Sequence, residues 1–507
     1  MRSLFIANRG EIALRVARTA RRMGLQVLGA FSSVDGGLPH LRLCHRATEL
    51  TGEPAKVYLD IGKIIDAARK LGADAVHPGY GFLAEKAEFA AAVNDAGMTF
   101  VGPTPKQIET LGDKVAAKKA AAAAGVPLVP GHAEALEDLA QARQVAQKVG
   151  YPVLIKAAGG GGGRGMRMVK AAAQFDDAFA RARSEAQAAF GDPRVFIERY
   201  IRRARHVEIQ VLGDGKGRAI SLGERDCSIQ RRHQKLLEES PAPGLVASVA
   251  AKMGALAAGL AASVNYRGAG TVEFIVPFGT QEFFFIEVNT RLQVEHPVTE
   301  MCTGIDLVEA QLLVAQRGAL PERLKTLMSG QSRLASLRRG HAIEARIIAE
   351  DPDNDFRPSC GKLDCVLLPN GPGVRVDSWA EAGLSVSPFY DSLLGKVIAW
   401  GQTRAEAIAR LELALHETLI GPLHNTAPFL ARLLATKALR SGQYDTGTLA
   451  RLQENGNGFG LDGIPAQAAV AAAAECLARS RRVAVMPRWL VGRALSPWQL
   501  SVSPEDR

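Results

Sequence analysis

The stretch Leu4-Phe5-Ile6-Ala7 is a short apolar run that leads into a helical pattern over residues 11–23. A second apolar run, Gln26-Val27-Leu28-Gly29-Ala30-Phe31, follows it. The same alternation continues to about residue 112. Strand-like runs that alternate with helices are typical of an open, largely parallel, doubly wound sheet. The sequence therefore predicts an α/β unit over residues 1–112.

The composition is that of an ordinary globular protein. The chain has 507 residues, of which 47% are hydrophobic and 22% charged, and this excludes a disordered or fibrous protein. Its length predicts about three domains. The 62 basic and 52 acidic residues give a net charge of +10, which favours anionic partners. Because no block of Lys and Arg carries interleaved aromatic residues, we expect phosphorylated small molecules rather than nucleic acid.

No segment has the pattern of a membrane span or a secretion signal. The apolar run after Arg2 ends before Asn8 and is too short for a signal peptide. The most apolar stretch, residues 246–264, contains Lys252 and consists mainly of Ala and Gly, so we expect a packed helix there. The six cysteines match no zinc or redox spacing. We therefore expect a cytoplasmic protein without a membrane partner.

Three further segments follow the first unit. Residues 113–320 are predicted to form a second unit, which contains a smaller unit over about residues 131–204. After a polar, basic connector, residues 335–442 mix strand and helix patterns as a further α+β unit, and residues 443–507 form a C-terminal extension.

A run of five glycines lies in the smaller unit. It follows Lys156-Ala157-Ala158 and precedes Arg164, between two strand-like segments. It is not a Walker A loop, because no Gly-Lys-Ser/Thr follows and no helix begins there. The alternative is a plain linker, but five consecutive glycines carry a high entropic cost on folding. We interpret the run as a hairpin tip whose backbone N–H groups close over an anion.

A second glycine string, Gly79-Tyr80-Gly81-Phe82-Leu83-Ala84, matches the dinucleotide pattern GxGxxG/A. It follows a predicted strand, and a helical pattern over residues 82–96 begins within it. However, it lies after a late strand of the first unit, and Gly102-Pro103 stands where an acid for the ribose is expected. The dinucleotide interpretation is therefore the less favoured one.

The strongest site signal is a pair of acidic strands. Residues 271–275 contain Glu273, and residues 285–291 contain Glu287 and Asn289. A hairpin centred on Thr280 places Glu273 opposite Glu287, with Asn289 on the same face. Facing carboxylates repel unless a cation binds both or one is protonated. Two carboxylates and an amide oxygen are hard ligands that suit Mg²⁺ or Mn²⁺ on nucleotide phosphates, although a solvated strand face is the alternative.

Charged side chains flank this hairpin on both sides. Arg291 and Glu295 follow it directly, so that they are candidates to hold an anion and remove a proton. Upstream, residues 224–235 crowd charges of both signs. Taken alone, that segment is interpreted as a salt-bridged surface loop.

Several of these motifs together resemble biotin carboxylase, both the free-standing bacterial subunit and the N-terminal part of acyl-CoA carboxylase alpha chains. The likeness covers about residues 2–445. It rests on Asn8-Arg9-Gly10-Glu11-Ile12-Ala13, His77-Pro78-Gly79-Tyr80-Gly81-Phe82-Leu83, the glycine run, Arg231-Arg232-His233-Gln234-Lys235, and Glu287-Val288-Asn289-Thr290-Arg291-Leu292-Gln293-Val294-Glu295-His296. The resemblance implies an ATP-grasp fold, in which a nucleotide lies between a lid at about residues 131–204 and a larger sheet.

The resemblance also implies roles for residues at matching positions. Those for ATP are Lys114, Lys156, Gly162 and Gly163 at the phosphates, Glu198, Arg199, Tyr200 and Ile201 at the adenine, and His206, Gln230 and His233 at the ribose and nearby phosphate. Glu273 and Glu287, with Asn289 close by, are expected to hold the metal. Lys235, Arg291, Gln293 and Val294 are expected to bind bicarbonate, with Glu295 as its base. Arg346 is expected to meet the ureido oxygen of biotin, with Tyr80 nearby.

The implied reaction is carboxylation of biotin at N1 through carboxyphosphate. Bicarbonate that has lost its proton to Glu295 attacks the γ-phosphorus of ATP, and the carboxyphosphate breaks into CO₂ and phosphate. The phosphate then removes the N1 proton while Arg346 stabilises the enolate oxygen. The substrates and cofactors are thus ATP, Mg²⁺ or Mn²⁺, bicarbonate and biotin on a carrier.

The sequence departs from the family at a few positions. Ala84 and Lys86 stand where Ser and Asn are usual, Arg199 stands for Lys, and Ala204 stands for Pro. No Ala/Val-Met-Lys-Met biotinylation sequence occurs, so we expect the biotin carrier on another chain or a missing C-terminal part. Leu495-Ser496-Pro497-Trp498 is similar to the entry to the middle domain of an alpha chain, so a truncated alpha chain is one interpretation. A separate carboxyltransferase and a homodimer or larger complex are the other expected partners.

Two other functions remain open at this point. A different ATP-grasp ligase would join a carboxylate to an amine or thiol and would be indifferent to Arg346→Ala. A nucleotide-sensing scaffold would bind ATP, but Glu295→Gln would leave every rate unchanged.

Overall fold

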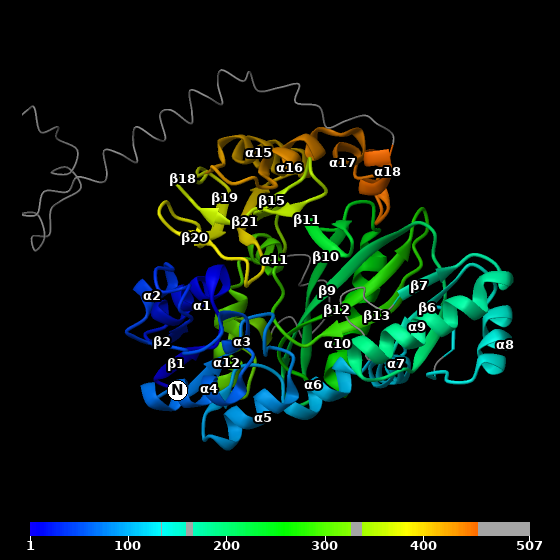
Figure 1. Ribbon diagram of the computed structural model, residues 1–507, viewed down its shortest axis with the longest axis horizontal. Coiled ribbons are helices and arrows are strands. Elements are labelled where there is room, and N and C mark those ends of the chain that lie inside the picture. The colour runs from blue at the N-terminus through cyan, green and yellow to red at the C-terminus, as the bar shows by residue number, and fades with distance from the viewer. Residues whose placement is uncertain (133, 159–165, 326–336, 455–507) are drawn as a thin grey trace, which may run out of the picture.

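The computed structural model describes residues 1–132, 134–158, 166–325 and 337–454. The chain begins with a five-stranded parallel sheet in the order β3-β2-β1-β4-β5 (Figure 1). Its strands are β1 (Ser3–Ile6), β2 (Gln26–Phe31), β3 (Arg46–Glu49), β4 (Ala75–His77) and β5 (Thr99–Phe100). Its helices are α1 (Gly10–Arg22), α2 (His40–Leu43), α3 (Pro54–Val57), α4 (Ile61–Leu71), α5 (Ala87–Asp95) and α6 (Pro105–Gly112). This confirms the predicted doubly wound parallel sheet.

The strand order of this sheet reverses direction between β1 and β4. The chain runs outward through β2 and β3, then returns to place β4 on the other side of β1. Ligands of open α/β sheets bind at the carboxyl ends of the strands where the order reverses. Asn8 follows β1 and Tyr80 follows β4, so both residues lie at that point.

A smaller unit carries a three-stranded antiparallel sheet in the order β7-β6-β8. Its elements are α8 (Leu139–Val149), β6 (Val153–Ala157), β7 (Met166–Val169), α9 (Phe175–Phe190) and β8 (Val195–Arg199). The preceding helix α7 (Lys114–Ala123) packs instead in the hydrophobic cluster of the largest sheet. Figure 1 shows α8 and α9 beside this sheet, at the end of the molecule away from the N-terminal unit. The glycine run joins β6 to β7 as predicted, but residues 159–165 lie outside the described part of the chain.

The largest element is an eight-stranded sheet in the order β13-β12-β9-β10-β11-β14-β21-β19. The strands are β9 (Ala204–Asp214), β10 (Ala219–Arg231), β11 (Gln234–Ser240), β12 (Arg267–Pro277), β13 (Phe284–Asn289), β14 (His341–Ile348), β19 (Val374–Ser378) and β21 (Leu393–Gly401). The helices between them are α10 (Ala247–Ser263), α11 (His296–Thr303), α12 (Leu307–Arg317) and α13 (Glu322–Lys325).

This sheet crosses the boundary between the units expected at residues 113–320 and 335–442. Strand β11 pairs antiparallel with β14, so that Leu237 faces Ala345 and Glu238 faces Glu344. The two segments therefore share one hydrogen-bonded sheet, a pairing between distant residues that local sequence patterns do not reveal.

The remaining elements cover the C-terminal end of that sheet. They are β15 (Glu350–Asp351), β16 (Arg357–Pro358), β17 (Gly361–Lys362), β18 (Cys365–Leu367), β20 (Ser385–Val386), β22 (Leu419–Gly421), α15 (Arg404–Glu417), α16 (Ala427–Ala435), α17 (Lys437–Ser441) and α18 (Thr448–Glu454). Leu411 and Leu415 of α15 pack with Val397 of β21 in the largest hydrophobic cluster. Most of the predicted extension, residues 455–507, lies outside the described residues.

Two local expectations were wrong. The helix expected from residue 82 begins at Ala87, because residues 81–86 form hydrogen-bonded turns and Phe82 has a φ of +42°. The surface loop expected over residues 224–235 is instead a hairpin of β10 and β11, whose turn holds Arg232 and His233 at φ of +49° and +68°. Among the described residues, no helix is long and apolar enough to cross a membrane.

Candidate active site

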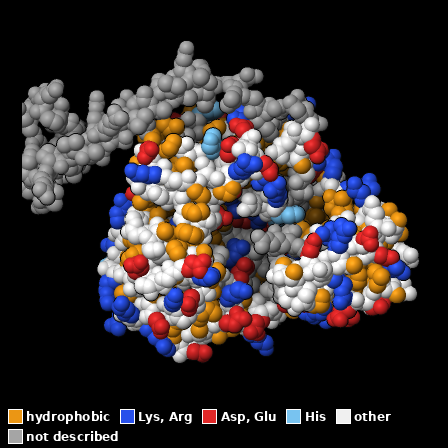
Figure 2. All heavy atoms as spheres, viewed as in Figure 1, with side chains coloured by type: hydrophobic (Ala, Val, Ile, Leu, Met, Phe, Trp, Pro, Cys, Tyr) orange, Lys and Arg blue, Asp and Glu red, His pale blue; other side chains and the backbone are white. Residues whose placement is uncertain are grey.

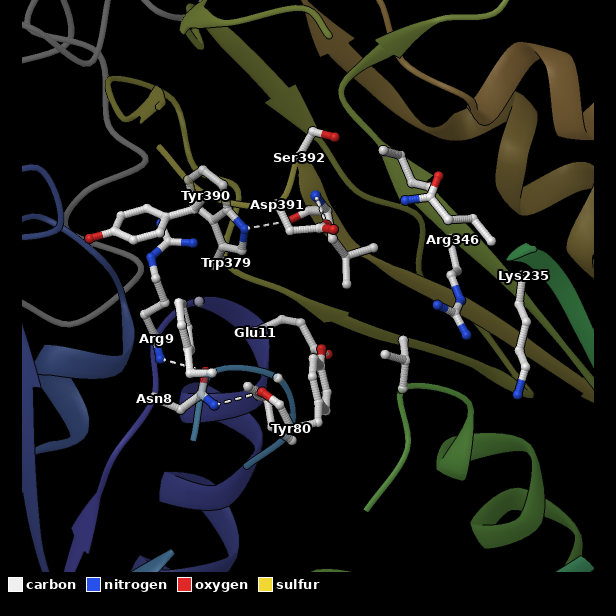
Figure 3. Close-up of a pocket in the computed structure, with 18 of the residues that line it drawn as sticks. Asn8, Arg9, Glu11, Tyr80, Lys235, Arg346, Trp379, Tyr390, Asp391 and Ser392 are labelled. Carbon is white, nitrogen blue, oxygen red and sulfur yellow. Dashed lines mark hydrogen bonds between the residues drawn. The ribbon is translucent and has the colours of Figure 1, made fainter. Parts of the chain in front are cut away.

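A cavity of about 330 Å³ opens where the N-terminal unit meets the eight-stranded sheet (Figure 3). Figure 3 shows Lys235 and Arg346 pointing into it from the strands, with Glu11 and Tyr80 on the opposite wall. The cavity is lined by Asn8, Arg9, Gly10, Glu11, Ile12, Tyr80, Gly81, Phe82, Gln234, Lys235, Arg291, Val294, Arg346, Ile348, Glu350, Trp379, Tyr390, Asp391, Ser392 and Leu393. Four of the predicted site residues therefore converge here together with Tyr80.

The glycine string after β4 shapes one wall of this cavity. Asn8 Nδ2 donates to the carbonyls of Pro78 at 2.7 Å and Tyr80 at 2.8 Å. Gly79 has a φ of +66°, and a Cβ there would lie 2.7 Å from Asn8 Nδ2, so glycine is required. The string forms a turn that presents Tyr80 to the cavity, and α5 begins several residues later. It lacks the strand–helix junction of a dinucleotide fingerprint.

Glu273 and Glu287 are directly opposite each other across β12 and β13, as predicted. Asn289 Nδ2 donates to Glu273 Oε1 at 2.9 Å. Burial and the Glu273 charge raise the pKa of Glu287, whereas Lys114 approaches Glu287 Oε2 at 3.8 Å. A partly exposed carboxylate with a raised pKa beside a second carboxylate shows that the negative charge of the pair is not fully balanced by nearby cations. These oxygen donors therefore fit a hard divalent cation.

Lys235 joins three carboxylates at the centre of the site. Its Nζ lies 2.6 Å from Glu208 Oε2, 3.0 Å from Glu273 Oε1 and 2.6 Å from Glu295 Oε1. Burial would raise the pKa of Glu273, but Lys235 and His206 outweigh it and hold this pKa well below its ordinary value. Lys235 thus holds three carboxylates together inside the protein.

Glu295 lies between two cations. In addition to Lys235, Arg346 Nη2 donates to Glu295 Oε2 at 2.9 Å, and Arg346 Nε donates to Glu238 Oε1 at 2.6 Å. Burial would raise the pKa of Glu295, but Lys235, Arg346 and Arg225 hold it well below its ordinary value. The carboxylate is therefore fully ionised and ready to accept a proton from a substrate that displaces its cations.

Arg291 has long contacts with its neighbours. Its Nε lies 3.2 Å from Glu85 Oε2, and its Nη2 lies 3.4 Å from Asn289 Oδ1. The nearby Gln293 Nε2 donates to Glu273 Oε1 at 3.0 Å. A half-buried guanidinium with such loose partners is suited to bind a small anion.

The predicted nucleotide residues gather between the lid sheet and α7. Lys156 Nζ lies 2.6 Å from Glu198 Oε2, and Lys118 forms a close ion pair with the other oxygen of Glu198. Burial would raise the pKa of Glu198, but the two lysines hold it at about 2. The side chain of Arg199 is exposed, while its backbone N–H donates to Pro130 O at 2.8 Å. Tyr200 and Ile201 follow β8 directly and are half-buried.

The remaining predicted nucleotide residues lie between Glu198 and the carboxylates around Lys235. His206 Nε2 lies 2.9 Å from Glu273 Oε2, and Gln230 faces Lys235 across β10 and β11. His233 lies in the turn of that hairpin, where burial and then the charges of His206 and Lys156 lower its pKa. Figure 2 shows a hollow between the lobe of α8 and α9 and the rest of the molecule, with basic and histidine side chains visible in it. Gly162 and Gly163 lie outside the described residues.

Two other groups of ligand-type side chains come close together. They are His206, Glu208 and Glu273, and Glu208, Cys227 and Glu295. The ammonium of Lys235 already contacts all three of these glutamates, and Arg225 and Arg346 pair with Glu208 and Glu295, so both groups have cationic partners without a metal. The Glu273–Glu287 pair remains the better candidate.

Sequence reasoning missed several charged residues that build the site. Arg225 is fully buried and contacts Glu208, Gln210 at 2.7 Å and Thr299 at 3.0 Å. Lys118, Glu238 and Lys396 were also missed. The available signal was a charged residue within an otherwise apolar strand, as at Lys396 in Leu393-Leu394-Gly395-Lys396-Val397-Ile398.

Almost the whole described chain matches protein families that are already known. Residues 1–108 match the biotin carboxylase N-terminal domain, residues 113–323 the ATP-binding domain of the carbamoyl-phosphate synthase L chain, and residues 344–451 the biotin carboxylase C-terminal domain. The biotin carboxylase of Nostoc sp. is 49% identical over 445 residues, which are 87% of this chain and 97% of that protein. The chain belongs to the biotin carboxylase family.

Other biotin carboxylase relatives extend the comparison. The alpha subunit of mitochondrial methylcrotonoyl-CoA carboxylase from Glycine max is 44% identical over 453 residues, 89% of this chain and 61% of that subunit. The biotin carboxylase domain dimer of Hydrogenobacter thermophilus 2-oxoglutarate carboxylase, solved with MgADP, ADP and bicarbonate, has a TM-score of 0.85 and 39% identity. The structural match covers 91% of this chain and 99% of the Hydrogenobacter domain. As a member of this family, the chain is a ligase with an ATP-grasp ATP-binding domain.

Proposed function

We propose that this biotin carboxylase carboxylates N1 of biotin on a carrier, as the first half-reaction of an acyl-CoA carboxylase. The observation that supports this most strongly is the Glu295 carboxylate, which contacts Lys235 at 2.6 Å and Arg346 at 2.9 Å. Lys235 and Arg346 both line the cavity. An ionised acid next to two cations and an open cavity suits an anionic substrate that must lose a proton.

Bicarbonate is assigned to the side of the cavity that carries Arg291. Its negative charge is held by Lys235 and Arg291, with Gln293 and the Val294 backbone beside it, and Glu295 takes its proton. The low pKa of Glu295 depends on its contacts with Lys235 and Arg346. A bicarbonate that draws those cations toward itself makes Glu295 more basic at the moment of proton transfer.

ATP is assigned to the space between the three-stranded lid sheet and the hairpin of β12 and β13. Lys114 and Lys156 neutralise its phosphates, Gly162 and Gly163 close over them, and residues 198–201 hold the adenine. His206, Gln230 and His233 contact the ribose and nearby phosphate. Glu273, Glu287 and Asn289 hold Mg²⁺ or Mn²⁺, which when bound neutralises phosphate charge.

After Glu295 has taken the bicarbonate proton, the remaining bonds form and break between substrate groups. An oxygen of deprotonated bicarbonate bonds to the γ-phosphorus of ATP as the bond to ADP breaks, which gives carboxyphosphate. Carboxyphosphate splits into CO₂ and phosphate, and the phosphate takes the N1 proton of biotin. N1 then bonds to CO₂, while Arg346 donates hydrogen bonds to the ureido oxygen and Tyr80 flanks the ring.

The partners follow from this chemistry. A biotin carrier domain or protein delivers the substrate, and a carboxyltransferase consumes the product. We also propose a homodimer or larger complex, in line with the dimer of the Hydrogenobacter domain. The cytoplasmic location expected from the sequence belongs to the same proposal.

The direct test is ATP hydrolysis by the purified protein with Mg²⁺. We expect phosphate release that requires bicarbonate and is stimulated by free biotin, together with carboxybiotin as product. A metal-loaded sample that hydrolyses ATP at the same rate with and without biotin would defeat the proposal.

A further inference from the structure

Lys396 is a buried cation in the middle of an apolar strand. Its side chain has no exposed surface, and its neighbours in β21 are Leu394, Gly395, Val397 and Ile398. A buried ammonium is costly unless it is paired and hydrogen-bonded. Lys396 also stands directly opposite Arg346 across β14 and β21. Two like charges on adjacent strands therefore need separate partners.

The two direct polar contacts of Lys396 come from the other two units of the molecule, while the charges of Glu344 and Asp377 in its own unit also act on it. Its Nζ donates to the carbonyl oxygen of Val294 at 2.9 Å and lies 3.1 Å from Glu11 Oε1. Glu11 belongs to α1, and the same oxygen accepts a close hydrogen bond from the hydroxyl of Tyr80. Tyr80, Glu11, Lys396 and the Val294 carbonyl thus form one continuous chain of polar contacts.

This chain joins two parts of the cavity. The Val294 carbonyl belongs to the peptide group that leads into Glu295, so a fixed carbonyl fixes the direction from which the Glu295 side chain leaves the backbone. Glu11, Tyr80 and Val294 also line the cavity, and Figure 3 shows Glu11 and Tyr80 on the wall opposite Lys235 and Arg346. Side chains that orient reacting groups through such contacts strongly affect rates without touching substrate.

We propose that Lys396, with Glu11 as its counter-charge, is a positioning residue that fixes the Val294–Glu295 peptide and the Tyr80 wall relative to each other. The inference rests on the proposed function, because it assigns Glu295 to bicarbonate and Tyr80 to biotin. It adds a residue from the C-terminal unit whose role is to align the two substrate positions.

The experiment separates this role from a merely structural one. Lys396→Met leaves Glu11 buried without a counter-charge and is expected to lower the melting temperature. The double variant Glu11→Gln with Lys396→Met removes both charges, so we expect the melting temperature to recover in part, since Glu344 and Asp377 still lose the charge of Lys396. The Val294 carbonyl still lacks its donor, and we expect kcat for biotin carboxylation to stay at least tenfold low, with KM for ATP within twofold of the parent. Lys437→Met, at an exposed lysine of α17, is the matched control and should match the parent.

Recovery of kcat in the double variant would overturn the inference, because Lys396 would then only balance the charge of Glu11. If both variants fail to fold, Glu11→Gln alone carries the test. It keeps an acceptor for Tyr80 but removes the charge facing Lys396, and we expect at least a threefold rise in KM for biotin. An unchanged KM and kcat would refute the inference. A parent protein without biotin-dependent turnover would instead refute the proposed function.

Discussion

Glu295 accepts a 2.9 Å hydrogen bond from Arg346, although the first precedes α11 and the second belongs to β14 of the C-terminal unit. The contact exists because β14 adds to β11 and carries Arg346 to the site. The group assigned to bicarbonate and the group assigned to biotin are therefore in direct contact. Binding of one substrate is expected to change the electrostatic surroundings of the other.

Glu295→Gln keeps the size of the side chain but removes its charge and proton affinity. We expect kcat for bicarbonate-dependent ATP hydrolysis to fall by about a thousandfold, the order of general-base catalysis. Steady-state phosphate release with saturating bicarbonate measures this. Glu417→Gln, at an exposed position at the end of α15, is the control and should retain the parent rate. Equal rates in the two variants would exclude Glu295 as the base.

Arg346→Lys keeps a positive charge but loses the guanidinium fork that reaches Glu238 and Glu295. We expect biotin-dependent turnover to fall by about a hundredfold, as for loss of an oxyanion donor, while KM for ATP stays within twofold. Carboxybiotin formation is the measurement. The same change at Arg181, which is exposed on α9, should have no effect. A large rise in KM for ATP would instead place Arg346 at the nucleotide.

Metal affinity is expected to depend on pH through Glu287. Burial and the charge of Glu273 raise the pKa of Glu287. A proton therefore competes with the metal for this carboxylate at pH values above those at which an ordinary glutamate is protonated. We expect the Mg²⁺ concentration for half-maximal activity to rise as the pH falls, with the rise beginning above the ordinary glutamate pKa of 4.5. Glu287→Gln should weaken Mg²⁺ binding and remove this dependence. A dependence that persists in Glu287→Gln would assign the titration to another group.

The stability of the protein in acid is expected to depend on Glu239. Burial would raise its pKa, but hydrogen bonds from His341 and Arg404 hold the pKa at about 2, against 4.5 for the ordinary group. Its contribution, about 3 kcal/mol, is therefore complete above pH 4.5 and is lost as the pH falls toward 2.

Urea unfolding at several pH values tests this prediction. Glu239→Gln should lose about 3 kcal/mol at pH 7 and show a weaker decline in acid. Glu412→Gln breaks a surface pair with Arg440 and should cost less than about 1 kcal/mol. Equal losses in the two variants would contradict the assignment.

Arg199→Lys tests whether the side chain after Glu198 matters for ATP. The Arg199 side chain is exposed, and its backbone already pairs with Pro130 and Val153. We therefore expect KM for ATP to remain within twofold of the parent. A tenfold change would show that the guanidinium itself contacts the nucleotide.

Local sequence patterns predicted the parts of the site that lie close together in the chain. The register of Glu273 against Glu287 follows from a hairpin centred on Thr280, and the structure has that register. The Asp113 side chain caps the first turn of α7, and Gly125 and Pro127 follow its end, which are local signals of the same kind. In these cases the determinants are turns, caps and the two-residue period of a strand.

Contacts between distant segments were beyond that reasoning. The pairing of β11 with β14, and the meeting of Lys396 with Glu11 and Val294, are set by the packing of whole units. Residues 224–235 were misinterpreted for a related reason. A strand that buries charged side chains against other charged side chains has the composition of a solvent-exposed loop, and only the partners, such as Glu208 for Arg225, distinguish the two.

The sheet common to residues 204–289 and 341–401 limits how this enzyme is divided in the laboratory. A cut near residue 340 would leave β11 and β14 each with a row of open backbone donors and acceptors, which invite aggregation. Chimeras that join the N-terminal part of one carboxylase to the C-terminal part of another near residue 340 would have to preserve both this strand pairing and the Glu238–Arg346 contact. No strand pairing of the described residues crosses the 112–113 junction, which is therefore the safer place to exchange parts.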